Sequence, residues 1–377
     1  MLSLASAVGA LVALGGCVRG PTPLPLSADA SDGDASADVD ASPGPTAPDA
    51  APPDAAAPPP LDLGVTFSPV GLGTGAGETN RPAFYAARRA HGRLVAHHIG
   101  WRDGGAIRPS CGTPPAVGQQ LEADARTYDF TLSLVVGWSS GSGVPDLACA
   151  PELVDNWSNP TTRARYKDVV VGLAAKLRPA YLFLGNEVNT WFLSHPADWA
   201  DWLTELDDVA KAVRATSPTT KVGTVYQYDH LRGAGAKNGW SEPAQWQLVA
   251  DVAGKVDVLG VTSYPFFDYD TPAAVPDDHY AELRNRWAGE LAITETGWRA
   301  TPSAPYAGSP ADQAAWPARM HQLFGPRLRY ATWLLLNDAD PSLDLGPFAT
   351  TGLRDAAGVP RPADGAWRTL VATQQAP

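Results

Sequence analysis

The sequence predicts an α/β protein built as a single (β/α)₈ barrel, and three observations support this fold. The chain has 377 residues, 44% of them hydrophobic, which is enough for a large buried core. From residue 61 onward, short apolar runs alternate with longer amphipathic stretches. The alternation occurs eight times, and eight β-then-α units are typical of a closed parallel barrel of roughly 250 residues.

The expected strands are nearly continuous apolar runs, as parallel strands buried on both faces usually are. They cover residues 63–67, 94–99, 130–136, 180–185, 221–226, 256–262, 291–295 and 330–336. Helices are expected between them. Asn159-Pro160 and Ser309-Pro310 each place an N-cap residue before a proline, which is a common helix start.

A doubly wound open sheet is the alternative fold. Its one cue is the run Gly71, Gly73, Gly75 and Gly77 after the first strand, which could form a nucleotide-binding loop. A lone glycine-rich loop is weak evidence, and no acidic ribose ligand follows the second strand. We therefore expect this run to form a loop over the mouth of the barrel.

The first sixty residues differ from the rest of the chain. Residues 2–16 are apolar and small, too short to span a bilayer, and typical of a signal peptide, although no Lys or Arg precedes them. Residues 18–60 hold eleven Pro, eleven Ala and seven Asp without an aromatic residue. Such a composition cannot bury enough apolar surface to fold, so we expect a disordered linker ahead of a catalytic domain at 61–377.

The three cysteines carry separate expectations. Leu14-Gly15-Gly16-Cys17 resembles the lipobox of bacterial lipoproteins, in which Cys17 would carry the lipid; an ordinary signal peptide is the alternative. Cys111 and Cys149 follow neighbouring strands at the same end, which favours a disulfide in an exported protein over two free thiols.

The net charge of −12 argues against nucleic acid or an anionic membrane surface as a partner. No cysteine–histidine spacing indicates zinc, and short acidic loop pairs such as Asp338-Ala339-Asp340 are usually solvated. We expect a monomer without cofactor or metal. Its membrane contact would be a lipid anchor on the cell envelope; secretion is the alternative.

Two glutamates end expected strands. Glu187 follows the fourth apolar run and Glu295 ends the seventh. Active sites of (β/α)₈ barrels lie at the carboxyl ends of the strands, and glutamate is seldom buried there without a partner. Structural ion pairing is the alternative. A pair of carboxyl groups, one protonated and one ionised, is what glycoside hydrolysis requires.

The sequence around these residues resembles that of glycoside hydrolase clan A. Gly185-Asn186-Glu187 ends strand four, and Glu295 ends strand seven. The runs 260–266 (GVTSYPF) and 293–298 (ITETGW) look most like the arabinogalactan endo-β-1,4-galactanase family, and somewhat like the cellulase/mannanase family. The resemblance covers residues 61–375 in architecture and is specific at strands four, six, seven and eight.

This resemblance implies roles for individual residues. Glu187 would be the general acid/base and Glu295 the nucleophile of a retaining mechanism. Asn186 would hold the sugar 2-hydroxyl. Tyr264 would hydrogen-bond the nucleophile. Trp333 would form the floor of the subsite at the cleaved sugar, with a core position as its alternative.

Other residues near strand ends are weaker candidates. Only one of His97 and His98 can face the cleft, because side chains alternate along a strand, and His98 is preferred. Trp138 and Trp298 follow strands three and seven and are expected to contact sugar. Tyr226, Tyr228 and His230 after strand five are further cleft candidates.

The sequence thus predicts a retaining hydrolase, endo-acting on a β-linked polysaccharide or oligosaccharide. Two alternatives use the same fold. One is a carbohydrate-binding lipoprotein that has lost catalysis, although a pure binder has no need of two buried glutamates. The other is a transglycosylase that acts on envelope glycans with the same residues.

Overall fold

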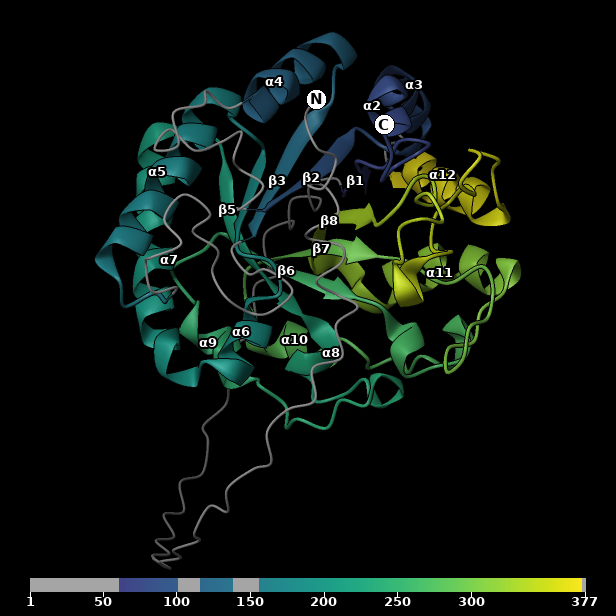
Figure 1. Ribbon diagram of the computed structural model, residues 1–377. Helices are drawn as coiled ribbons and strands as arrows, with labels where there is room; N and C mark the ends of the chain where they lie inside the picture. The colour runs from purple at the N-terminus through teal and green to yellow at the C-terminus, as the bar shows by residue number, and fades with distance from the viewer. Residues whose placement is uncertain (1–60, 101–115, 138–155, 375–377) are drawn as a thin grey trace, which may run out of the picture. The chain divides into compact units, whose positions relative to one another are not determined.

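The computed structural model describes residues 61–100, 116–137 and 156–374. Eight parallel strands close into a barrel in chain order, and β1 pairs with β8 at the seam (Figure 1). This confirms the predicted (β/α)₈ barrel. The strands are β1 Asp62–Thr66, β2 Leu94–Gly100, β3 Thr131–Gly137, β4 Tyr181–Leu184, β5 Lys221–Gln227, β6 Val258–Ser263, β7 Glu290–Thr296 and β8 Leu328–Trp333.

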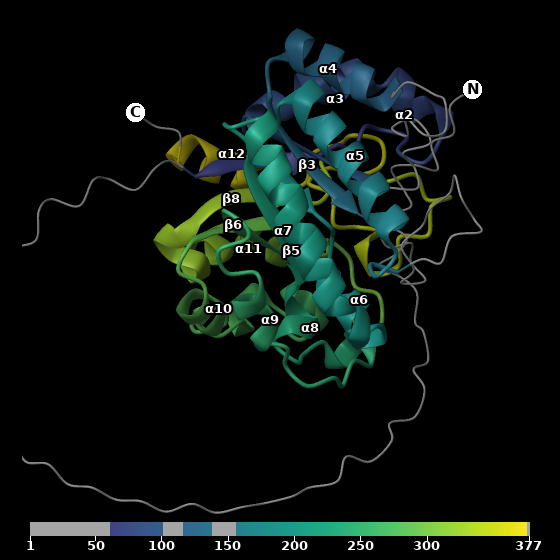
Figure 2. The same ribbon diagram turned by 90° about the vertical axis from the view of Figure 1, so that its left-hand side faces the viewer.

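Helices lie outside the barrel, with α5 and α7 side by side along one flank (Figure 2). The described α-helices are α2 Gly75–Thr79, α3 Arg81–Arg88, α4 Ala116–Tyr128, α5 Pro160–Leu177, α6 Val188–Ser194, α7 Trp199–Thr216, α8 Tyr228–Leu231, α9 Gln247–Asp251, α10 Ala281–Arg286, α11 Pro310–Phe324 and α12 Pro362–Gln374. Both predicted caps form, because the Asn159 and Ser309 side chains accept from the amides of Thr161 and Asp312.

Strand alternation divides the apolar residues into two cores. One set fills the barrel interior and consists of Leu94, Val135, Tyr181, Phe183, Val225, Val258, Ala292 and Tyr330. A much larger set faces the helices. Which set a strand residue joins fixes whether its side chain can reach the interior, and this assignment decides several of the predicted site residues below.

The last helix, α12, is bonded to the 3₁₀ turn that precedes β2. The imidazole of His91, in the 3₁₀ turn Arg89–His91, lies 2.8 Å from the Oδ1 of Asp364 on α12. Trp367 of the same helix donates from its indole nitrogen to the carbonyl of His91, at 3.0 Å. Both pairs are buried, so α12 is fixed to the beginning of the domain rather than only to its neighbour α11.

Several expectations fall outside the described residues. They concern the signal segment with Cys17, the linker 18–60, the pair Cys111 and Cys149, and Trp138. Within the described ranges, no helix is both long and apolar enough to cross a membrane.

Candidate active site

The chain leaves β4 through two residues in the left-handed region, and this brings Glu187 to the mouth of the barrel. Gly185 has a φ of 79°, which glycine adopts without steric cost. Glu187 has a φ of 51° and caps the start of α6. A residue with a side chain costs about 1 kcal/mol or more in this conformation, so its surroundings must hold it there.

A buried amide network behind Glu187 supplies that restraint. Asn189, two residues further along α6, is fully buried. Its side-chain nitrogen donates to the carbonyl of Gln227 at 3.0 Å, and its side-chain oxygen accepts from the Gln227 amide at 2.8 Å. A third bond joins Asn189 to Gln245 at 2.9 Å. The side chain of Asn189 thereby ties the residues after β4 to the end of β5.

A β-bulge in β7 directs Glu295 into the barrel. Val261 of β6 pairs with Ile293, but the next residue, Thr262, pairs with Glu295, so Thr294 is an extra residue. Paired residues of parallel strands point to the same side, and Thr262 points inward, since its hydroxyl reaches Glu187. Without the bulge, regular alternation from the inward-facing Ala292 would turn Glu295 toward the helices.

Glu295 is buried among polar hydrogens. The hydroxyl of Tyr264 donates to its Oε2 at 2.7 Å, and the amide of Asn186 donates to its Oε1 at 3.3 Å. His98 Nδ1 lies 3.3 Å from the same Oε1. Burial and the nearby Glu295 charge raise the pKa of Tyr264 well above its usual value, so the phenol keeps its proton and donates. These contacts stabilise an ionised carboxylate.

Glu187 lies in a different environment. Its Oε1 accepts a hydrogen bond from the hydroxyl of Thr262 at 2.6 Å. Burial and, less strongly, the Glu295 charge together raise the pKa of Glu187 to about 8, although the bond from Thr262 opposes both effects. Asp229, after β5, adds a smaller effect in the same direction as Glu295. At neutral pH, Glu187 is therefore mainly protonated.

The structure brings His98, and not His97, to this site. His97 points to the helices, where its ring stacks on Phe67 with centroids 4.9 Å apart and its Nε2 lies 3.3 Å from the Tyr85 hydroxyl. Burial lowers the pKa of His98, although the Glu295 charge opposes this. His98 is therefore a neutral imidazole beside the carboxylate.

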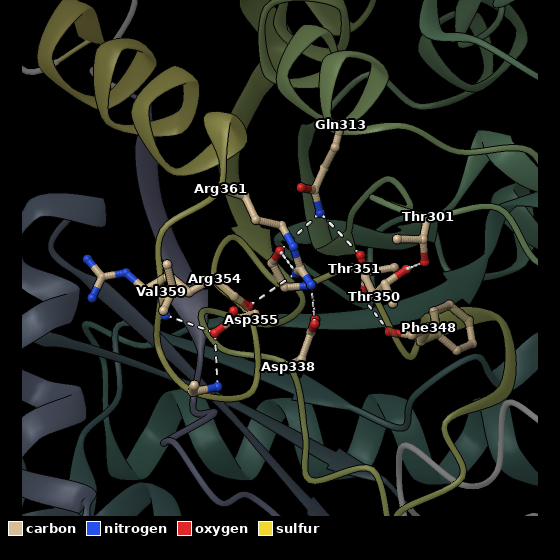
Figure 3. Close-up of polar contacts among 12 residues, drawn as sticks. Thr301, Gln313, Asp338, Phe348, Thr350, Thr351, Arg354, Asp355, Val359 and Arg361 are labelled. Atoms are coloured by element: carbon tan, nitrogen blue, oxygen red, sulfur yellow. Dashed lines mark hydrogen bonds and ion pairs between the residues drawn. The ribbon is translucent and has the colours of Figure 1, made fainter.

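The long connection after β8 supports the tyrosine that holds Glu295. Phe348 packs its ring edge-on against Tyr264, with centroids 4.7 Å apart. Figure 3 shows how this connection is braced: Arg361 pairs with Asp338 at 2.5 Å, and Gln313 of α11 donates to the carbonyl of Thr350 at 3.3 Å. No sequence signal relates Phe348 to Tyr264, because 84 residues separate the two positions.

An open pocket of about 610 Å³ lies in the same connection. Leu343, Leu345 and Asp355 are among its lining residues. Neither glutamate lines it, so we place the chemistry at the paired carboxyl groups and not at this pocket.

The predicted roles of Trp333 and Trp298 are wrong in this structure. Trp333 is fully buried on the helix side of β8, with its ring 5.6 Å from that of Trp367 and its indole nitrogen bonded to the carbonyl of Thr351. Trp298 is also fully buried, with its ring 5.5 Å from that of Trp316 on α11. Neither indole presents a face to the barrel mouth, so both are core residues.

Alternation along β5 also decides which way the side chains at its end point. The hydroxyl of Tyr226 donates to the carbonyl of Leu248, and that of Tyr228 donates to the carbonyl of His279. Both tyrosines therefore point into the layer of helices and not into the barrel. His230 stacks on Trp240 with centroids 3.9 Å apart. The inward position belongs to Gln227, which sequence reasoning missed.

Metal chemistry receives no support from the described residues. No group of three or more His, Cys, Asp or Glu side chains in the described ranges is placed to hold a metal ion. Asp338, one of the acidic loop residues considered above, is paired with Arg361.

The chain resembles known glycoside hydrolases in sequence and in fold. The model of glycosyl hydrolase family 53 matches residues 167–317, the stretch that contains both glutamates. No curated protein matches the chain.

Solved structures share the fold. A family 5 glycoside hydrolase variant from Streptomyces cattleya, solved with Manβ1-4GlcNAc, has a TM-score of 0.64 at 17% identity, covering 84% of this chain and 81% of that one. The family 53 catalytic domain of Ignisphaera aggregans has a TM-score of 0.54 at 15% identity, covering 85% and 98%.

A family 39 glycoside hydrolase from Bacteroides cellulosilyticus has a TM-score of 0.59 at 17% identity; the match covers 84% of this chain but 64% of that enzyme's length. At such identities the likeness establishes the barrel fold. The match to the family 53 model adds a similarity in sequence over the region that contains both glutamates. The resemblance to glycoside hydrolase clan A is thereby confirmed, and the match to family 53 supports a glycoside hydrolase.

Proposed function

We propose that the protein is a retaining, endo-acting hydrolase of a β-linked polysaccharide or oligosaccharide, with Glu295 as nucleophile and Glu187 as general acid/base. The observation that carries the proposal is the contrast between the two carboxyl groups. Among the described residues, three polar side chains contact the Glu295 carboxyl, whereas one donates to the Glu187 carboxyl, whose pKa is raised. An ionised nucleophile beside a protonated acid is the arrangement that glycosyl transfer requires.

In the first step, a carboxylate oxygen of Glu295 attacks the anomeric carbon and forms a glycosyl ester. The glycosidic C–O bond breaks at the same time, and the Glu187 proton passes to the departing oxygen. Glu187, now ionised, then takes a proton from water, and the resulting hydroxide attacks the anomeric carbon and releases Glu295. The second step restores both carboxyl groups to their starting states.

In this cycle, Asn186 contributes by binding the sugar. Its amide nitrogen donates to Glu295, and its oxygen is buried without a hydrogen-bond partner among the described residues. A sugar hydroxyl beside the anomeric carbon would donate to that oxygen. Such a bond strengthens as positive charge develops on the ring in the transition state.

The similarity to family 53 favours a β-linked galactan as the first substrate to test. Galactan, mannan, xylan and β-glucan would be incubated with the full-length protein, while reducing ends and product lengths are followed. Internal cleavage gives a ladder of intermediate oligosaccharides from the start. Release of a single small product would overturn endo action.

Two measurements test the mechanism. Proton NMR of the first product should show the β-anomer before mutarotation, because two displacements restore the starting configuration. A 2-deoxy-2-fluoro glycoside with a good leaving group should label the peptide that contains Glu295. An initial α-anomer, or a label on another residue, would overturn the mechanism.

We further propose that the protein is exported and anchored through a lipid on Cys17. This proposal is supported by the apolar run 2–16, by the resemblance of residues 14–17 to a lipobox and by the composition of the linker 18–60. Labelled palmitate should enter the protein in a bacterial host and be absent from the Cys17→Ser variant. Equal labelling of both would overturn the anchor. A Cys111–Cys149 disulfide is tested by peptide mapping without reduction.

A further inference from the structure

Two unpaired hydrogen-bond acceptors flank the proposed nucleophile. His98 Nε2 and Asn186 Oδ1 are both buried, and neither has a hydrogen-bond partner within the described ranges. Leaving a buried polar atom unpaired costs about 1–3 kcal/mol, so native proteins rarely keep such atoms without a reason. Here both lie on side chains that already contact Glu295.

The geometry places the two acceptors close to the same carboxylate oxygen. His98 Nδ1 and Asn186 Nδ2 each lie 3.3 Å from Glu295 Oε1. In both side chains a single carbon separates the contacting nitrogen from the unpaired atom: Cε1 in the imidazole and Cγ in the amide. A sugar that presents its anomeric carbon to Glu295 would therefore have neighbouring hydroxyls within reach of both atoms.

The protonation state of His98 fixes what it can bind. Burial lowers its pKa, so the ring is neutral and carries one proton. A neutral imidazole beside a carboxylate holds that proton on the facing nitrogen, which is Nδ1 here. Nε2 then has a lone pair and no hydrogen, and it can accept a hydrogen bond but cannot donate one.

We propose that His98 Nε2 accepts a hydrogen bond from a free hydroxyl of the sugar bound at Glu295, and that this contact selects the substrate. Together with Asn186 Oδ1, it requires a sugar with two free hydroxyl donors beside the anomeric centre. Deoxy and O-alkylated sugars at the position facing His98 are rejected, since they leave Nε2 unpaired. The inference rests on the proposed function, because it uses Glu295 as the point where the sugar binds.

The test removes single hydroxyl groups from the substrate and the imidazole of His98 from the protein, and compares the two losses of activity. The full-length protein and its His98→Ala and His98→Gln variants would be assayed on aryl glycosides of the best substrate and on its monodeoxy analogues. One monodeoxy analogue should be hydrolysed by the wild type about 10- to 100-fold less well in kcat/KM, beyond the intrinsic effect measured in acid hydrolysis. That penalty should largely disappear in His98→Ala. His98→Gln, which retains an acceptor, should keep part of it.

The outcomes separate this inference from the function beneath it. If His98→Ala lowers kcat/KM by the same factor on the parent and on every analogue, His98 only orients Glu295, and the inference fails while the hydrolase stands. If no glycoside is hydrolysed, the proposed function fails. Calorimetric binding of the same sugars to wild type and His98→Ala then decides the inference: equal affinities for parent and analogue in both proteins would overturn it.

Discussion

The carboxyl ends of β4 and β7 present the same side chain in different hydrogen-bonding environments. At β7, Glu295 contacts Tyr264, Asn186 and His98, all through groups that favour its charge. At β4, Glu187 is buried with one hydrogen bond from Thr262, and its pKa rises to about 8. Both carboxyl groups are buried, so the contrast between them lies in the donors that the described residues supply to each.

The largest expected effect comes from removing the charged member of the pair. Glu295→Gln should lower kcat by about 10⁴- to 10⁶-fold, since no other group can form the glycosyl ester. Steady-state rates on an activated aryl glycoside measure this. Glu290→Gln is a matched control on the same strand, because Glu290 pairs with Lys221 at 2.5 Å and is partly exposed. Activity within about tenfold of wild type in Glu295→Gln would refute the assignment.

Removing the protonated member should have an effect that depends on the leaving group. Glu187→Gln should lower kcat/KM by about 10²- to 10⁴-fold on substrates with a poor leaving group. The first step should change far less on dinitrophenyl glycosides, which need no protonation. A series of aryl glycosides measures the slope of rate against leaving-group pKa. A slope equal to that of wild type would show that Glu187 is not the acid.

The hydroxyl that donates to Glu295 should have an intermediate effect. Tyr264→Phe keeps the ring that packs on Phe348 and removes only the bond to Glu295. The carboxylate loses a charge-assisted bond, so kcat should fall about 10- to 100-fold. Phe348→Leu, which changes the ring contact but not the bond, should cost less. A larger loss in Phe348→Leu than in Tyr264→Phe would reverse this order.

The smallest effect is a shift in pH dependence. Activity requires protonated Glu187, so kcat/KM should fall as the pH rises through about 8. Thr262 donates to the ionised form and lowers the pKa of Glu187; Thr262→Val should therefore move the alkaline limb to higher pH, by about one unit. The profile between pH 5 and 10 measures the shift. A limb that moves to lower pH would contradict the environment described for Glu187.

The sequence was sufficient for the barrel and for the two glutamates. Eight apolar runs separated by helical segments have few other solutions, and the observed strands begin and end within three residues of the expected positions. Glu187 and Glu295 could be identified from the sequence for a related reason. A carboxyl group that ends a buried strand is a conspicuous exception to the apolar pattern.

The orientation of the tryptophans was beyond sequence reasoning. Trp333 and Trp298 occur where strands end, but a strand end indicates depth along the barrel axis and not which face a side chain takes. Trp333 follows Thr332 in regular alternation and so faces α12. The supporting contacts of Asn189 with Gln227 and Gln245 join positions 38 and 56 residues apart, and no local pattern reports such pairs.

The extra residue in β7 has a consequence for sequence comparison and for library design. An alignment that threads β7 onto a regular barrel strand without a gap would assign Glu295 to the outer face and miss the nucleophile. Straightening β7 at its present length would turn the carboxylate toward the helices, whereas deleting Thr294 would restore regular pairing and keep Glu295 opposite the inward-facing Thr262. In this protein, the direction in which Glu295 points therefore depends on the register of a strand as well as on its composition.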